Sequence, residues 1–100
     1  MSDRFITDQN IADFHMFLID EERSSGTIKK YIHDSRMFKT WLGECPVNKE
    51  KAAQWKRELI ESGRAPATVN SMLAAVNTFF RFMRWEDLHL KSIRLQRRFF

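Results

Sequence analysis

The sequence contains a single cysteine, Cys45, and no apolar run near the ~20 residues that a membrane-spanning helix needs. One cysteine excludes an internal disulfide and a cysteine cluster for zinc. The N-terminus mixes charges and leads into an amphipathic segment, unlike a signal peptide. These absences predict a soluble, cytoplasmic protein without a membrane partner.

Side chains arranged for catalysis are also missing. His15, His33 and His89 lack metal-ligand spacing, and no Ser/His/Asp or Cys/His grouping stands out. Tyr31 is the only tyrosine and so the only possible tyrosine nucleophile, but it falls on an apolar helical stripe and is expected in the core. The sequence therefore predicts no metal, no cofactor and no enzymatic activity for this chain alone.

The chain is similar to itself at an offset of 41 residues. Segment 27–42 aligns with 68–83, and positions 14, 18, 19, 20 and 23 match positions 55, 59, 60, 61 and 64. Apolar residues recur at helical spacing in both copies, and nothing between residues 5 and 85 alternates with period two. The predicted fold is an all-α four-helix bundle built from two helical hairpins.

Capping residues and breakers divide this bundle into helices at about 8–22, 27–43, 48–62 and 66–85. Thr27 and Asn48 are the expected caps of the second and third helices, and Pro66 suits the first turn of the fourth. With 43% hydrophobic residues, the chain is large enough for one core. We predict a bundle domain at 1–86 and a truncated linker at 87–100, leading to a domain absent from this sequence.

Charge is distributed unequally along the chain. Residues 1–50 hold seven Lys/Arg and nine Asp/Glu, whereas residues 51–100 hold ten and four. Such a basic excess is typical of proteins with an anionic partner such as nucleic acid, and equally of a soluble basic surface.

Polar side chains follow one edge of each second helix. Advancing 100° per residue, the edge of helix 27–43 carries Lys29, His33, Arg36 and Thr40. The same offsets on helix 66–85 carry Asn70, Ala74, Asn77 and Arg81, with Arg84 continuing the line. Cations suit phosphates, and amides and hydroxyls suit phosphates or base edges. The duplication favours duplex DNA as the partner over two ordinary solvated edges.

Three further polar residues lie at or just before helix starts. Thr27 and Thr68 occupy equivalent positions, where each can cap its own helix or place a hydroxyl against a phosphate. Arg64, in the loop before the fourth helix, is either a phosphate contact or an idle surface charge.

Four segments, SGTIKKY at 25–31, FKTWL at 38–42, ATVNSML at 67–73 and FFRFM at 79–83, resemble the N-terminal core-binding domain of tyrosine recombinases of the phage-integrase and Xer type. In that family the domain is a small SAM-like helical bundle that, with a following catalytic domain, clamps the recombination site in double-stranded DNA. The resemblance implies that the second and fourth helices face the major groove. It also implies other recombinase protomers as partners in a synaptic complex, although the isolated domain is expected to be monomeric.

The DNA contacts implied by position are Thr27, Lys29, Lys30, His33, Arg36, Arg64, Thr68, Asn70, Asn77, Arg81 and Arg84. The C-terminal tail resembles the interdomain linker of the family, which implies contacts with the DNA backbone by Lys91, Arg94, Arg97 and Arg98. The family's catalytic residues belong to the second domain, so the parent protein is expected to be a recombinase and this chain its DNA-binding part.

Two other interpretations remain open. A helical protein-interaction module is favoured by the apolar tail residues and by Phe99 and Phe100. A helix-turn-helix regulator is weaker, because no short turn joins two helices ahead of a single recognition helix.

Overall fold

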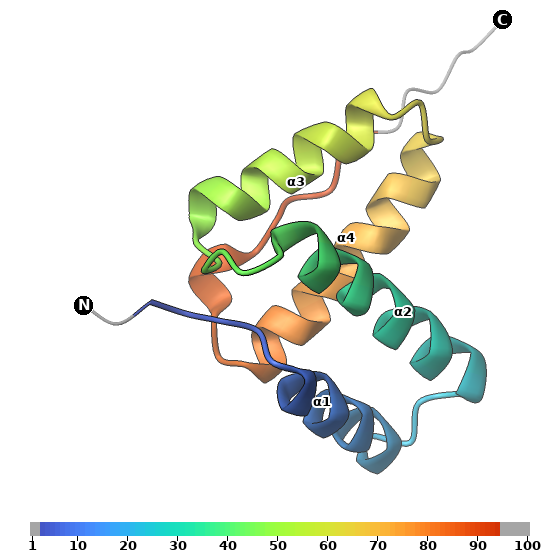
Figure 1. The fold of residues 1–100 in the computed structure, drawn as a ribbon. Helices are drawn as coiled ribbons and strands as arrows, with labels where there is room; N and C mark the ends of the chain where they lie inside the picture. Colours follow the sequence, from blue (N-terminus) through green and yellow to red (C-terminus); the bar gives the residue numbers. More distant parts are fainter. Residues whose placement is uncertain (1–2, 95–100) are drawn as a thin grey trace, which may run out of the picture.

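The computed structural model describes residues 3–94, which form four α-helices and one short 3-10 helix (Figure 1). The predicted all-α bundle is confirmed. Within this range the strand-like pairing consists of one isolated antiparallel bridge between Arg4 and Val47. The elements are α1 (Asp8–Asp20), α2 (Ser25–Leu42), α3 (Lys49–Glu61), α4 (Pro66–Phe82) and η1 (Glu86–Leu88).

The helix boundaries reproduce the sequence repeat. α3 begins and ends 41 residues after α1, and α4 begins 41 residues after α2. The positive-φ residues that follow the helices obey the same offset, since Glu22 pairs with Gly63 and Gly43 with Arg84. The two hairpins therefore have turns at equivalent positions as well as equivalent apolar faces.

Helix starts agree with the sequence in α1, α3 and α4 but not in α2. Asn48 caps α3 by accepting a hydrogen bond from the Lys51 amide at 2.8 Å, and Pro66 occupies the first turn of α4. Thr27 does not cap α2: Ser24 does, accepting from the Thr27 amide at 3.2 Å and donating to the Thr27 hydroxyl at 2.9 Å. Thr68 stands at the equivalent third helical position of α4, so the predicted caps at Thr27 and Thr68 are wrong by one turn.

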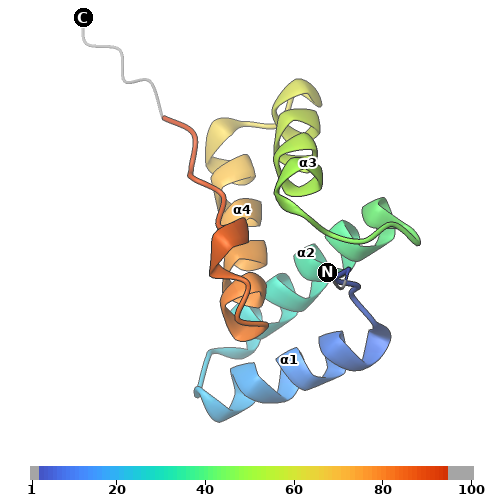
Figure 2. The ribbon, with the colours of Figure 1, turned by 90° about the vertical axis from the view of Figure 1, so that its left-hand side faces the viewer.

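α2 and α4 form the centre of the bundle, with α1 and α3 on opposite sides of this pair (Figures 1 and 2). The core is rich in phenylalanine. Phe38 of α2 lies against Trp55 of α3 at 4.9 Å between ring centroids and against Phe80 of α4 at 5.6 Å. Phe14 of α1 lies 5.2 Å from Phe79 of α4. Burial of these rings joins all four helices into one core.

Glu22, in the turn that follows α1, has an unfavourable backbone conformation. Its φ is 59°, in the left-handed region, whereas the repeat places glycine at the equivalent position, Gly63. A side chain in that region costs roughly 1–2 kcal/mol. Glu22→Gly should therefore raise the free energy of unfolding by about 0.5–1 kcal/mol, after the greater chain entropy of glycine is subtracted. Urea unfolding measures this change. Gly63→Ala is the matched control and should destabilise the fold, whereas a destabilising Glu22→Gly would contradict the account.

A pH-dependent contact ties the N-terminal segment to η1. The Arg4 guanidinium donates to both carboxylate oxygens of Asp87, at 2.9 and 3.0 Å. These hydrogen bonds hold the pKa of Asp87 below its ordinary value. Because the unfolded chain then binds the proton more tightly, this stabilisation is complete above the unfolded pKa, about 3.9, and is lost as the pH falls through the folded value.

Asp87→Asn should accordingly lower the free energy of unfolding at about pH 6, and this effect should shrink once the pH falls below the unfolded pKa of about 3.9. Urea unfolding at a series of pH values, with wild type and variant compared, measures the difference. Glu44→Gln, which removes an exposed loop carboxylate, serves as the control. A difference that stays constant down to about pH 3 would show that Arg4 does not depend on the ionised carboxylate.

Candidate nucleic-acid interface

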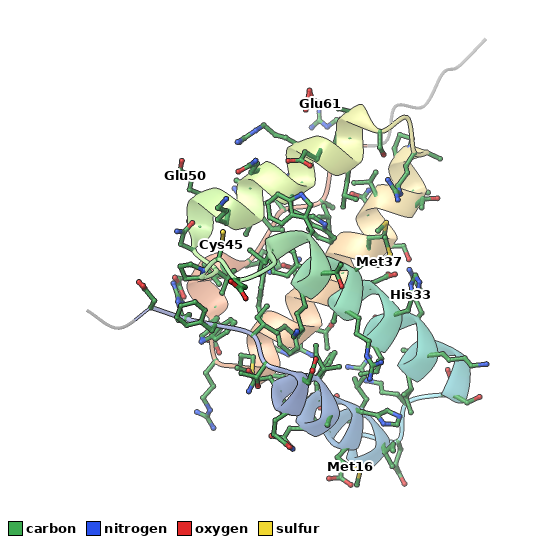
Figure 3. The ribbon with its side chains drawn as sticks, in the orientation of Figure 1. Met16, His33, Met37, Cys45, Glu50 and Glu61 are labelled. Carbon is green, nitrogen blue, oxygen red and sulfur yellow. The ribbon has the colours of Figure 1, made fainter. Side chains whose placement is uncertain are left out.

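The polar edge predicted on α2 is exposed along its length. Amphipathic spacing buries Ser35, Phe38 and Leu42, and this places the opposite edge in solvent. Figure 3 shows His33 and Met37 leaving α2 on the same side. The exposed members of the edge are Lys29, His33, Arg36 and Thr40.

Two shallow hollows border this edge. One lies between α1 and α2 and is lined by His15 together with Lys29, His33 and Arg36. The other lies farther along α2, beside Thr40. His33 and Arg36 line both hollows. An anionic ligand lying along α2 would therefore meet the cationic side chains of Lys29 and Arg36, with the His33 imidazole between them.

Asp34 is a charged residue that the sequence analysis overlooked. Its side chain is 5% exposed, and its carboxylate accepts from Lys30 Nζ at 2.6 Å and contacts His33 Nδ1 at 3.2 Å. It is the sole carboxylate in α2 and α4 together. The i,i+4 spacing of Lys30 and Asp34 was a signal that could have predicted the pair. Lys30 is thus bound to an internal counter-ion, unlike Lys29.

The corresponding edge of α4 differs from that of α2. Ala74 and Arg81 are exposed, but Asn70 and Asn77 are half-buried. Arg84 is exposed as well, but α4 ends at Phe82 and Arg84 follows with a φ of 61°, so the prediction that it continues the helical edge is wrong. Each asparagine amide is hydrogen-bonded to the backbone of the C-terminal segment, Asn77 to Leu90 and Asn70 to Ile93. The structure therefore gives these two side chains a partner within the chain, which the helical spacing alone could not indicate.

Part of the predicted linker is packed on the bundle. Leu88 is fully buried and Leu90 is 7% exposed, and both belong to the hydrophobic core. Lys49 Nζ donates to the Asp87 carbonyl at 2.9 Å, and Lys56 Nζ donates to the Lys91 carbonyl. Packing thus continues past the predicted boundary at residue 86. Lys91 and Arg94 are exposed, whereas Arg97 and Arg98 lie outside the described residues.

The remaining predicted contacts lie near the start of α4. Thr68 is exposed in the first turn, and Arg64 is exposed in the preceding loop, where its guanidinium donates to Ser62 Oγ at 2.8 Å. Arg94 follows Ile93, which is bound to Asn70, so Arg94 lies at this same end of α4. The predicted residues consequently form separate groups on α2 and at the two ends of α4.

Tyr31 is half-buried and packs against the core, with the Arg23 guanidinium 5.9 Å from its ring centroid. Among residues 3–94, no group of three or more His, Cys, Asp or Glu side chains is placed to hold a metal ion. No helix in the described part of the chain is long and apolar enough to cross a membrane.

Comparison with protein-family models matches residues 11–87 to the phage integrase N-terminal SAM-like domain. No curated protein and no solved structure gives a match. The matched range covers α1 from its first buried residue, Ile11, includes α2, α3 and α4 completely, and ends within η1. The chain belongs to the family of phage integrase N-terminal SAM-like domains.

Proposed function

We propose that this chain is the DNA-binding domain of a tyrosine recombinase and that it holds duplex DNA chiefly through the exposed edge of α2. Membership of the integrase family supports the recombinase part of this proposal. The parent protein would cleave and rejoin DNA through a catalytic domain following this one, in the cytoplasm, with other protomers assembled on the same DNA.

The distribution of charge on α2 is the observation that carries the DNA-binding part. Lys29 and Arg36 are exposed, and neither is ion-paired with a carboxylate among the described residues. The one carboxylate of the helix, Asp34, is buried and bound to Lys30. Cations that lack an internal counter-ion are available to displace the counterions of DNA phosphates, which supplies most non-specific affinity.

The other predicted residues take graded roles in this proposal. Thr40 and His33 extend the α2 edge, and the exposed arginines Arg81 and Arg84 add cations at the end of α4. Toward the start of α4, we propose contacts with the DNA backbone by Arg64, Thr68, Lys91 and Arg94. We leave out Lys30, Thr27, Asn70 and Asn77. The charge of Lys30 is paired with Asp34, and the other three side chains already have hydrogen-bond partners within the chain.

A salt series of DNA-binding measurements tests the proposal. A fluorescent duplex of about thirty base pairs is titrated with the domain at several salt concentrations, and anisotropy gives the dissociation constant. We expect weak binding at low salt that declines with a slope of about −0.9 per phosphate contact on logarithmic axes. Absence of binding at low salt, or binding that salt does not weaken, would contradict the proposal.

Protein interaction is the second candidate function. Met16 and Ile19 of α1 are 56% and 45% exposed, and Ile19 borders the same hollow as Ile28 and Ile32 of α2. Exposed apolar side chains grouped beside a hollow favour a protein partner. Met16→Ser/Ile19→Ser should leave DNA binding unchanged if DNA is the partner of the α2 edge.

A further inference from the structure

Two asparagines of α4 hold the chain that leaves the bundle. Asn77 Nδ2 donates to the Leu90 carbonyl at 2.8 Å, and Asn77 Oδ1 accepts from the Leu90 amide at 2.8 Å. Asn70 repeats this pair with Ile93, at 2.9 and 2.7 Å. Each side-chain amide thus pairs with one residue as a neighbouring strand would. We call Asn70 and Asn77, with the segment Leu90–Ile93, the asparagine clasp.

The rise per residue of a helix and that of an extended chain explain why both asparagines reach the segment. Asn70 and Asn77 are seven residues apart on a helix, which at 1.5 Å per residue is roughly 10.5 Å. Leu90 and Ile93 are three residues apart in an extended chain, which at ~3.3 Å per residue spans about 10 Å. The segment runs antiparallel to α4, toward the helix start, as Figure 2 shows.

Apolar burial and lysine contacts strengthen this attachment. Leu88 and Leu90 are buried in the core. The segment is therefore anchored both just before Leu90 and at Leu90 itself, where it pairs with Asn77. The lysine side chain of Lys56, on α3, binds the carbonyl of Lys91. The segment is therefore held from α3 as well as from α4.

We propose that Asn70 and Asn77 are positioning residues that fix the chain leaving this domain, and that the clasp stays closed when DNA is bound. The clasp of the free domain does not depend on DNA, whereas the inference that it stays closed in a DNA complex rests on the proposed function. A domain joined after Arg94 would then be carried on an arm of fixed starting point and direction, which narrows the volume it searches compared with a free tether beginning at residue 86.

The clasp also limits what α4 can read in DNA. Bidentate recognition of adenine by asparagine needs both the amide N–H and the carbonyl oxygen in one plane. In Asn70 and Asn77 both groups already point at backbone partners. With the clasp closed, these side chains do not read bases, and the cationic contact from α4 comes from Arg81, with Arg84 in the turn that follows the helix.

Hydrogen exchange of single backbone amides tests the clasp without DNA. In wild type, the Leu90 and Ile93 amides should exchange slowly. Asn77→Ala should speed exchange at Leu90, and Asn70→Ala at Ile93, each by about tenfold, the loss expected for one hydrogen bond. Asn77→Asp keeps the acceptor but sets a carboxylate oxygen against the Leu90 carbonyl, and the repulsion of these two acceptors should speed exchange of the Leu90 amide as well. Ser71→Ala, a neighbouring change on α4, should alter neither amide.

A spin label tests whether the clasp stays closed on DNA. Ser92→Cys in a Cys45→Ser background places a nitroxide between the two clasp points and should broaden the amide signals of α4 near Ala74. We expect the same broadening with duplex DNA bound and its loss in the Asn70→Ala/Asn77→Ala variant.

The outcomes separate the two proposals. Equal exchange at Leu90 and Ile93 in wild type and both alanine variants would overturn the clasp, and broadening that disappears on DNA would overturn its closure in the complex. Altered exchange in a domain that fails to bind duplex would support the clasp and reject the proposed function.

Discussion

Phe38→Ala is expected to destabilise the domain by about 3–5 kcal/mol, the range for removing a buried aromatic side chain from a packed core. Phe38 has no exposed surface and stacks near Trp41 at 6.1 Å while meeting Trp55 and Phe80 edge-on. Its removal leaves a cavity between α2, α3 and α4. Since small domains are stable by only about 5–15 kcal/mol, the variant would be partly unfolded at moderate temperature.

Urea unfolding followed by circular dichroism measures this effect. Phe5→Ala is the matched control, because Phe5 is 50% exposed and its loss should cost little. Phe38→Leu should recover most of the stability by refilling the cavity. Similar midpoints for Phe38→Ala and Phe5→Ala would show that the centre of the bundle is not where the structure places it.

Lys29→Ala/Arg36→Ala is expected to weaken binding to duplex DNA by roughly tenfold per cation near 0.1 M salt, because each lost phosphate contact removes about 0.9 from the salt slope. Both side chains are exposed on α2 and can be changed without opening the core. Anisotropy titrations at several salt concentrations give the affinity and the slope from the same data.

Arg57→Ala provides the control for general charge. Arg57 is an exposed arginine of α3 outside the proposed surface, so its loss should act only through screened, distant repulsion. A fall in slope that is equal for Arg57→Ala and Arg36→Ala would mean that DNA binds the basic surface without using the α2 edge. Unchanged thermal stability of the double variant is needed to attribute the loss to contacts.

The repeat was the strongest signal in the sequence. Helical spacing of apolar residues and the 41-residue offset predicted the four helices, and the offset holds at the turns Glu22/Gly63 and Gly43/Arg84. Periodicity succeeds here because burial of one helical face dominates the packing of small bundles. The start of α2 was missed because Ser24 and Thr27 are both good caps, and the spacing of apolar residues does not choose between them.

The site could be predicted only where side chains point to solvent. Lys29 and Arg36 lie where the helical spacing placed them, on an exposed edge. Asn70 and Asn77 share that spacing but bind backbone groups twenty-three and thirteen residues later in the chain, respectively, and a helical pattern cannot reveal such partners. An amide on a helix edge suits DNA and extended backbone equally well, since both present a donor beside an acceptor.

A titration of the isotope-labelled domain with a duplex of about thirty base pairs, at low salt, tests the central claim that α2 is the DNA-binding edge. We expect backbone amide shifts to gather between Lys29 and Thr40 and near Arg81 and Arg84, and to fade as salt rises. The side-chain amide signals of Asn70 and Asn77 should stay in place. Shifts that are absent, or that gather on α1 at Met16 and on α3 at Arg57 instead, would contradict the account.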